Sequence, residues 1–432
     1  MKLTSESTAR ATPWIARSAA ARVRAAILVL FVLGGPAASA QSTVNAASLP
    51  AHLRPTLDGT ATLIYDASPG RRVQLTVLSD PAGLEATRLT LETTAEDLKP
   101  LVTEIRELAL RRPPASLGRI VRLGDQLGEL LLAPVADQLG SVSRLGLSAN
   151  GPLSDLAFGV VRAPRSLDPQ GRYLIEARTL CWIDPALGDG NAADRPASDR
   201  PVALAIADAV YRPPARPLGA SMSDGGISWR QHAARRNQAG TIRALGLPVV
   251  SRFGQAASPA IFWESAESYA VRLLHLAVEA QIDPANPDRS ALLLSPERYD
   301  EQAIPVGTGQ LASRLALERE SLVVLSGLDT GNHGIGPGPF VEAFGAAGAG
   351  SVVASLWPVV DESTTHLFDA FYEKLAEGAT PAGALRDAQS RLLAEPLRFE
   401  QGEGREPVEF DALHPYHWAG YRVYRGSAAT CG

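Results

Sequence analysis

The decapeptide LVVLSGLDTG, residues Leu322 to Gly331, combines an apolar run with a loop of small and polar residues. The first four residues are apolar without alternation, which is typical of a strand that is covered on both faces. A loop at the carboxyl end of such a strand is where α/β proteins place functional side chains. A second stretch, LLHLAVEAQIDP (Leu273 to Pro284), has the same form. These two strand ends define the candidate functional region.

Strand and helix patterns alternate through most of the chain. A hairpin is expected around Ser68-Pro69-Gly70, and Thr380 and Pro381 fit the N-cap and first position of a helix. Helices are predicted over 95–110, 116–139, 362–376 and 381–394, and strands over 144–147, 173–183, 202–207, 272–277, 322–326, 351–356 and 421–424. The alternation predicts an α/β fold with a predominantly parallel sheet flanked by helices on both faces, preceded by a β-hairpin and a helical pair.

The first forty residues have the features of a secretory signal. Basic residues precede the apolar run AAILVLFVLGG, and Ala38-Ser39-Ala40 follows it as an A-x-A cleavage pattern. The run is shorter than the roughly 20 residues of a spanning helix, which favours cleavage before Gln41 over an N-terminal anchor. We predict a signal peptide at 1–40, a linker at 41–55, a main domain at 56–426 and a flexible tail at 427–432. The mature chain is expected to be periplasmic or secreted, without stable membrane insertion.

Composition and charge narrow the possible functions. The 432-residue chain is 45% hydrophobic and 20% charged, which is ordinary for a globular protein. Its net charge is −5, or −9 without the signal segment, which carries five basic residues and one acidic residue. An acidic chain without a later basic run is a poor candidate for nucleic-acid binding. An oxidising compartment would permit Cys181 and Cys431 to pair, but the sequence leaves the pairing open. Because no Cys, His or Asp spacing matches a metal site, neither metal nor cofactor is expected.

Several long motifs follow one another in a characteristic order. Besides the two strand ends, they are NGPLSDLAFGVV, GRYLIEARTLCWIDP, the long segment containing SVVASLWPVVDESTTHLF, and HPYHWAGYRVYRG. In the long segment Trp357, Val359, Asp361 and Thr364 stand in register. Together these motifs resemble the CHAT family, a bacterial caspase-like peptidase domain that is often attached to tetratricopeptide repeats. The resemblance covers nearly all of the mature chain and implies a caspase-like sheet.

The resemblance also implies where catalysis would reside. In active family members a His in an A-T-H-G motif takes the proton of a Cys in L-S-A-C-x-T-G, and the thiolate attacks a carbonyl. Carried over residue by residue, the His position is Glu279, the following Gly is Ala280, and the Cys position is Leu328. Leucine has no lone pair for attack, and a carboxylate beside a thiol would raise the pKa of that thiol. The resemblance therefore implies a cysteine-peptidase scaffold without a catalytic residue.

Two other catalytic interpretations have less support. Asp329-Thr330-Gly331 spells the D-T-G of aspartic peptidases, but those enzymes need two aspartates that share a proton, and the sequence has one D-T-G. Ser326 would need His275 or His333 as its base, yet this serine lies within the predicted strand and belongs to the family pattern. His275 is expected in the packing of the sheet, and His333 on an exposed loop.

We therefore predict an exported, catalytically inactive CHAT-domain protein that binds a protein or peptide, such as a repeat protein or an active peptidase paralogue. The alternative is an active CHAT-type peptidase that uses other residues or is completed by a partner. Asp361 and Thr364 are expected to hold a helix start after Trp357, and His414 and His417 to serve packing and hydrogen bonding. The cleft candidates are Glu279, Ala280, Ser326, Gly327, Leu328, Asp329, Thr330, Gly331, Trp357 and Asp361.

Overall fold

The computed structural model describes only part of the chain. The described residues are 42–55, 58–79, 85–111, 116–184, 186–187, 200–211, 241–283, 285–298, 301–318, 320–326, 328–329, 338–357, 361–399, 408–410, 412–426 and 431. The predicted signal segment, His333 and the candidates Gly327, Thr330 and Gly331 lie outside these ranges. For Leu328, Asp329 and Asp361 the backbone alone is described. Within these ranges, none of the helices has both the length and the apolar character to cross a membrane.

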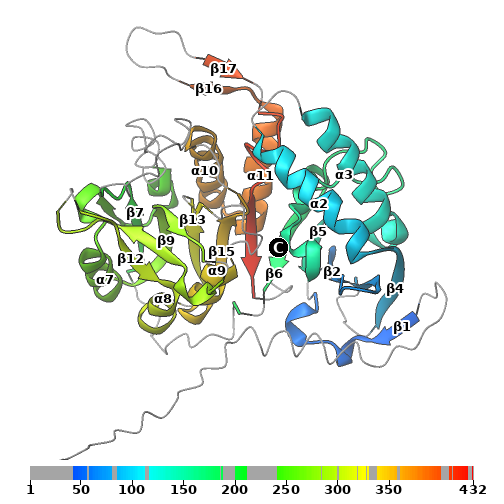
Figure 1. The fold of residues 1–432 in the computed structure, drawn as a ribbon, viewed down its shortest axis with the longest axis horizontal. Helices are drawn as coiled ribbons and strands as arrows, with labels where there is room; N and C mark the ends of the chain where they lie inside the picture. Colours follow the sequence, from blue (N-terminus) through cyan, green and yellow to red (C-terminus); the bar gives the residue numbers. More distant parts are fainter. Residues whose placement is uncertain are drawn as a thin grey trace, which may run out of the picture. The chain divides into compact units, whose positions relative to one another are not determined.

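A large mixed sheet, twelve-stranded in the described residues, organises the chain (Figure 1). In spatial order its strands are β1 (Ser42–Asn45), β4 (Glu85–Thr94), β3 (Arg72–Leu78), β2 (Thr60–Asp66), β5 (Arg144–Ala149), β6 (Thr179–Ile183), β18 (Tyr421–Arg425), β15 (Ala349–Ser355), β13 (Ser321–Leu325), β9 (Val271–Ala277), β7 (Val202–Ala207) and β8 (Val249–Phe253). We call the first six the N-terminal half-sheet and the last six the C-terminal half-sheet. The strands from β15 to β8 are mutually parallel, and β18 is antiparallel to β15 but parallel to β6.

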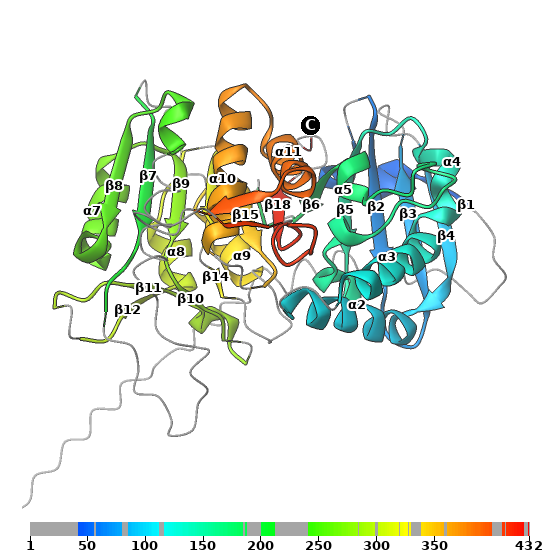
Figure 2. The same ribbon diagram turned by 90° about the horizontal axis from the view of Figure 1, so that it is seen from above.

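Helices cover both faces of the C-terminal half-sheet. Figure 2 shows α10 and α11 on one side of β15 and β18, and α8 and α9 on the other. This double coverage explains why β7 and β13 are buried along their whole length and read as uninterrupted apolar runs. The helices are α2 (Ala95–Leu110), α3 (Leu117–Leu131), α4 (Ala136–Leu139), α5 (Leu174–Ala177), α7 (Pro259–Ser268), α8 (Thr308–Arg314), α9 (Gly338–Ala346), α10 (Asp361–Ala376) and α11 (Pro381–Ala394).

Short 3₁₀ segments and two small sheets complete the described structure. The small sheets are β12 (Ile304–Gly307), β11 (Ala291–Leu294), β10 (Ala280–Gln281) and β14 (Leu328–Asp329) in that order, and the ribbon of β16 (Leu397–Phe399) with β17 (Val408–Phe410). The 3₁₀ segments are η1 (Ala46–Ser48), η2 (Ala51–Leu53), η3 (Ala133–Val135), η4 (Gly151–Asp155), η5 (Phe158–Val160), η7 (Ile242–Leu245), η8 (Gly254–Ala256) and η9 (Pro287–Arg289).

Local sequence signals account for the main helix starts. The Thr380 hydroxyl accepts a hydrogen bond from the Gly383 N–H (3.2 Å), with Pro381 as the first residue of α11, so the predicted cap is confirmed. Thr94 and Asp97 form a reciprocal capping box at α2, with hydrogen bonds of 3.2 and 3.1 Å. The predicted hairpin is also confirmed, because β2 and β3 pair antiparallel across the turn at Pro69 and Gly70.

Three expectations need correction. The segment expected as a linker contains β1, whose residues Ser42–Asn45 pair antiparallel with β4. The strand predicted over 173–183 begins only at Thr179, because the Glu176 carboxylate accepts the Tyr173 N–H (2.9 Å) and closes the helical turn α5. Asp361 was expected as the N-cap that precedes the helix, but it is the first residue of helix α10. The strands β4 and β8 and the small sheets were not predicted.

Candidate functional site

The two strand ends that the sequence singled out meet at one edge of the sheet. β9 and β13 are parallel neighbours with Leu273 opposite Leu322, and the Ser326 N–H donates to the Leu276 carbonyl oxygen at 3.0 Å. Beyond them, β10 and β14 pair in parallel, with Ala280 directly opposite Leu328. The prediction that these strands are parallel neighbours, with positions 279 and 328 close together, is confirmed.

Glu279 stands between β9 and β10 and is held at both ends. Its carboxylate accepts a hydrogen bond from the Tyr211 hydroxyl, and its carbonyl oxygen accepts the Leu293 N–H at 2.8 Å. The side chain is partly exposed, whereas Ala280 and Ser326 are buried. Of the cleft candidates whose side chains the structure describes, Glu279 is therefore the one that solvent reaches.

Tyr211 is a site residue that sequence reasoning missed. It follows β7, and the chain between them turns at Asp208, which has a left-handed φ of 58°. The Asp208 N–H donates to the Ala277 carbonyl oxygen at 3.2 Å, and the Val210 N–H donates to the Ser295 hydroxyl at 2.8 Å. These contacts fix the segment after β7 against the ends of β9 and β11. The sequence feature that could have indicated Tyr211 is the apolar run of β7, a third buried strand whose carboxyl end reaches the same edge.

Ser326 and His275 do not form a nucleophile–base pair. The His275 ring is fully buried; its Nδ1 lies 2.7 Å from the Tyr372 hydroxyl, and the ring packs edge-on against Phe368 of α10. Burial lowers the pKa of His275 to about 3, so the ring stays neutral. The carbonyl of Ser326 accepts the Tyr421 hydroxyl at 3.0 Å, within the sheet. The expected packing role of His275 is confirmed.

The start of α10 and Trp357 before it contact the segment before β18 through hydrogen-bonding groups. Trp357, a predicted cleft residue, is only 1% exposed, and its Nε1 donates to the Tyr416 carbonyl oxygen at 3.4 Å. The His417 Nδ1 lies 3.1 Å from the Ser363 hydroxyl, and burial lowers the pKa of His417 to about 4. Trp357 therefore supports the site from the core instead of lining it, and the hydrogen-bonding role expected for His417 is confirmed.

A second serine–histidine contact joins the start of α3 to the segment before β18. The Ser116 hydroxyl is 2.6 Å from His414 Nε2, and both residues are buried. Because His414 Nδ1 accepts the Tyr416 N–H (3.2 Å), the neutral ring carries its proton on Nε2 and donates to Ser116, whose hydroxyl donates to the Leu108 carbonyl oxygen at 3.3 Å. The imidazole thus has no lone pair directed at the serine, and the contact is structural.

The fold and the paired strand ends define an α/β domain with a mostly parallel sheet and a candidate site at the carboxyl edge of its strands. The chain belongs to the CHAT domain family, whose model matches residues 121–427. It is therefore a caspase-like, peptidase-related domain. The match begins within α3, so the β2–β3 hairpin and α2 precede it.

Solved structures similar to this chain are cysteine peptidases of low sequence identity. The Arg-specific cysteine proteinase gingipain R is 12% identical, over 78% of this chain and 75% of that chain, with a TM-score of 0.40. The complex of Porphyromonas gingivalis RgpB pro- and mature domains is also 12% identical, over 78% and 77%, with a TM-score of 0.40. The Saccharomyces cerevisiae separase–securin complex is 9% identical, over 86% of this chain but 30% of that chain, with a TM-score of 0.46. No curated protein matches the sequence.

Proposed function

We propose that this chain is an exported CHAT-domain protein that has lost peptidase chemistry and acts by binding a protein or peptide. The observation that carries the proposal is the pairing of Ala280 with Leu328. It supports the assignment of Glu279 and Leu328 to the His and Cys positions of active family members. A leucine supplies no nucleophile, and the Glu279 carboxylate is already engaged by Tyr211.

The cysteines support the exported location. Cys181 and Cys431 form a disulfide with a Cα–Cα distance of 5.7 Å, which is within the ordinary range. Disulfides persist in oxidising compartments and are rare in the cytosol. The pairing therefore agrees with the predicted signal segment, and it places Cys431, expected in a flexible tail, against β6.

The ligand that best fits the strand ends is an extended peptide. In the described residues β14 is an outer strand of its small sheet, with β10 as its neighbour on one side. An extended segment can add to such an edge through main-chain hydrogen bonds, with side chains giving specificity. Exported protein segments of this form, from a repeat protein or a peptidase paralogue, are the proposed partners.

Loss of chemistry is tested with the purified mature chain, residues 41–432. It should cleave no member of a peptide library and take up no electrophilic active-site probe. The double variant Glu279→His with Leu328→Cys, made with and without Tyr211→Phe, should gain probe labelling above that of Gln281→Cys. The control thiol of Gln281→Cys replaces the exposed residue of β10 beside the same edge. Turnover by the unmodified chain that a substitution at this edge abolishes would refute the proposal.

Binding is tested on an array of extended peptides with a matched pair of variants. Gln281→Pro removes a backbone N–H from the β11 side of β10 and should loosen the small sheet that presents β14, whereas Gln281→Ala keeps that N–H. We expect peptide binding by the unmodified chain and by Gln281→Ala, and at least a tenfold weaker affinity for Gln281→Pro, on the order of 1.4 kcal/mol. Equal affinities for the two variants would refute binding at this edge.

A further inference from the structure

In the part of the chain that the structure describes, the two half-sheets pair along one short joint, β6 against β18. The joint has two aligned residue pairs, Trp182 with Tyr424 and Ile183 with Arg425. The joints on either side are longer, with four pairs between β5 and β6 and five between β15 and β18. One further hydrogen bond, from the Asp184 N–H to the Arg425 carbonyl oxygen (2.8 Å), extends the joint. Strand pairing alone therefore holds the halves together less firmly than it holds each half.

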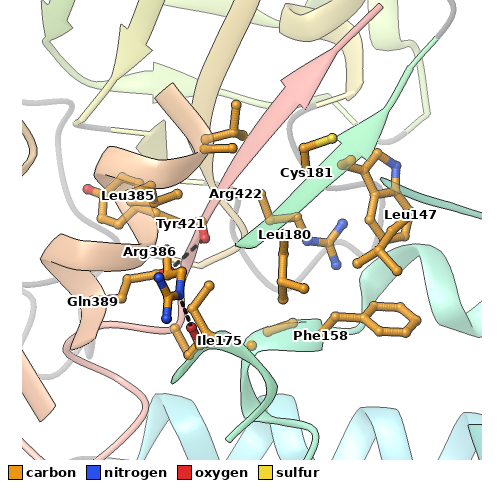
Figure 3. A pocket seen from close by; sticks show the side chains of 16 residues that line it. Leu147, Phe158, Ile175, Leu180, Cys181, Leu385, Arg386, Gln389, Tyr421 and Arg422 are labelled. Carbon is orange, nitrogen blue, oxygen red and sulfur yellow. Dashed lines mark hydrogen bonds between the residues drawn. The ribbon is translucent and has the colours of Figure 1, made fainter. Parts of the chain in front are cut away.

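The packing beside this joint is incomplete. A cavity of about 30 Å³ lies between the strands of the joint, α5 and α11, with Phe158 and Leu180 facing Leu385 and Arg386 (Figure 3). Its volume is enough for about two water molecules, whereas ordinary protein interiors leave few voids of this size. The side chains beside the joint therefore leave a small gap.

Two arginines cross the joint and bind main-chain carbonyls on its far side. Arg422 of β18 donates to the Ser154 carbonyl oxygen at 2.8 Å and to that of Leu156, and it stacks 4.3 Å from the Trp182 ring. Arg386 of α11 donates to the Glu176 carbonyl oxygen at 2.9 Å. Figure 3 shows Arg386 next to Ile175, the residue before Glu176. Burial lowers the pKa of Arg422, because the cation loses hydration at this position. These contacts are directional and need the halves to stay in register.

The disulfide lies at the same joint. Cys181 is the central residue of β6, and Cys431 follows the last residue of β18 by six positions. Both cysteines are buried, at 2% and 1% exposed. The bridge thus ties the chain that leaves β18 to β6. The chain segment from β7 to β18, which forms the C-terminal half-sheet, is therefore joined covalently to β6 at its start and at its end.

The joint also connects to the candidate site through β18. Tyr421, the first residue of β18, donates to the Ser326 carbonyl oxygen at 3.0 Å and lies 3.4 Å from the Thr364 hydroxyl. Gly420 lies so close to Trp357 that a Cβ there would be 2.9 Å from the indole nitrogen. A shift of β18 would therefore disturb both the end of β13 and the start of α10.

We infer that the Cys181–Cys431 disulfide is a covalent lock on the β6–β18 joint, and that opening it lets the half-sheets part there and loosens the candidate site. A dithiol reductant opens the lock in a two-electron exchange. The sulfur–sulfur bond breaks, each cysteine sulfur ends as a protonated thiol, and the dithiol becomes a cyclic disulfide. After reduction no covalent link joins Cys181 to Cys431. The joint then depends on two strand pairs, the Asp184 hydrogen bond, the arginine contacts and the packing of α11 on both strands.

Hydrogen exchange followed by mass spectrometry tests this inference on residues 41–432. The samples are the oxidised chain, the chain refolded under a dithiol, the variant Cys431→Ser, and a control variant, Leu75→Ala. Leu75 is fully buried in β3, far along the sheet from the joint, so its truncation destabilises the fold without touching the lock. No peptide ligand is needed, so the result is independent of the proposed binding function.

We expect the reduced chain and Cys431→Ser to exchange at least about tenfold faster than the oxidised chain in β6, in β18 and at residues 321–326 and 361–368. β2 and β3 should be unchanged in these two samples, and Leu75→Ala should show the opposite distribution. Dithiol should have no further effect on Cys431→Ser. Faster exchange confined to the last residues, spread evenly over both half-sheets, or absent would overturn the lock.

Discussion

His275 should make the stability of this protein depend on pH in a way that one substitution removes. Its ring is fully buried between β9 and α10; Nδ1 contacts the Tyr372 hydroxyl, and Nε2 has no hydrogen-bond partner in the described residues. A charged imidazole in this position would lose its hydration without gaining a counter-charge. Burial accordingly lowers the pKa of His275 from 6.5 to about 3.

The sign and size of the effect follow from proton linkage. Above about pH 6.5 the histidine is neutral in both the folded and the unfolded chain, so it adds no pH dependence. As the pH falls from there toward about 3, the unfolded chain binds a proton that the folded chain excludes, and the folded state loses stability. Between about pH 7.5 and about pH 5, His275 alone should lower the free energy of unfolding by about 2 kcal/mol.

The measurement is urea unfolding at both pH values for the unmodified chain, His275→Asn and Leu274→Ala. Asparagine cannot titrate but can still reach Tyr372, so the drop in the free energy of unfolding should be about 2 kcal/mol smaller for His275→Asn. Leu274→Ala removes a fully buried neighbour but keeps the histidine, so its drop should match the unmodified chain. His417 and the carboxylates are common to all three chains and cancel. An equal drop in His275→Asn and in the unmodified chain would show that His275 is not the group responsible.

Three further changes should alter the free energy of unfolding in chemical denaturation. Gly128→Ala would place a methyl group onto the Arg162 carbonyl oxygen and should cost about 1–3 kcal/mol. Gly118→Ala, on the exposed face of the same helix, should be neutral or stabilise the protein by up to about 1 kcal/mol. Equal effects of the two substitutions would contradict the close packing of α3. Cys431→Ser opens a bridge between residues 250 positions apart and should cost up to about 5 kcal/mol, so an unchanged unfolding midpoint would argue against the disulfide. Thr380→Ala removes the cap of α11 and should cost about 1 kcal/mol, and Thr380→Ser should recover most of it.

The sequence was sufficient for the parts of the fold that local patterns determine. Uninterrupted apolar runs predicted the parallel core strands, and the carboxyl ends of two such strands had to share an edge. That these two strands are neighbours, with Glu279 and Leu328 close together, was predicted from the order of the family motifs. The Thr380 cap was equally visible, because it needs only the hydroxyl and the proline after it.

The remainder depended on contacts between distant parts of the chain. Tyr211 reaches Glu279 across 68 positions, and the buried strand β7 before it indicates the shared edge but not this contact. The segment from Tyr173 has a strand-like pattern, but it forms a helical turn because the Glu176 carboxylate accepts one hydrogen bond there. The Cys181–Cys431 pairing was left open, because only the position of β18 beside β6 brings the end of the chain to the middle of the sheet.

The central position of β18 has a consequence for how the chain reaches its native state. Residues Tyr421–Arg425 follow all the other described strands in the chain, yet they stand between β6 and β15. Until they arrive, both neighbours carry an unpaired, apolar edge, and such edges invite association with other chains. Tyr424 and Trp182 pair across about 240 positions, and contacts of such long range slow folding. A nascent chain that stops short of Tyr421 is thus two open half-sheets, so the two halves cannot join before β18 is made, and both edges stay open to association until then.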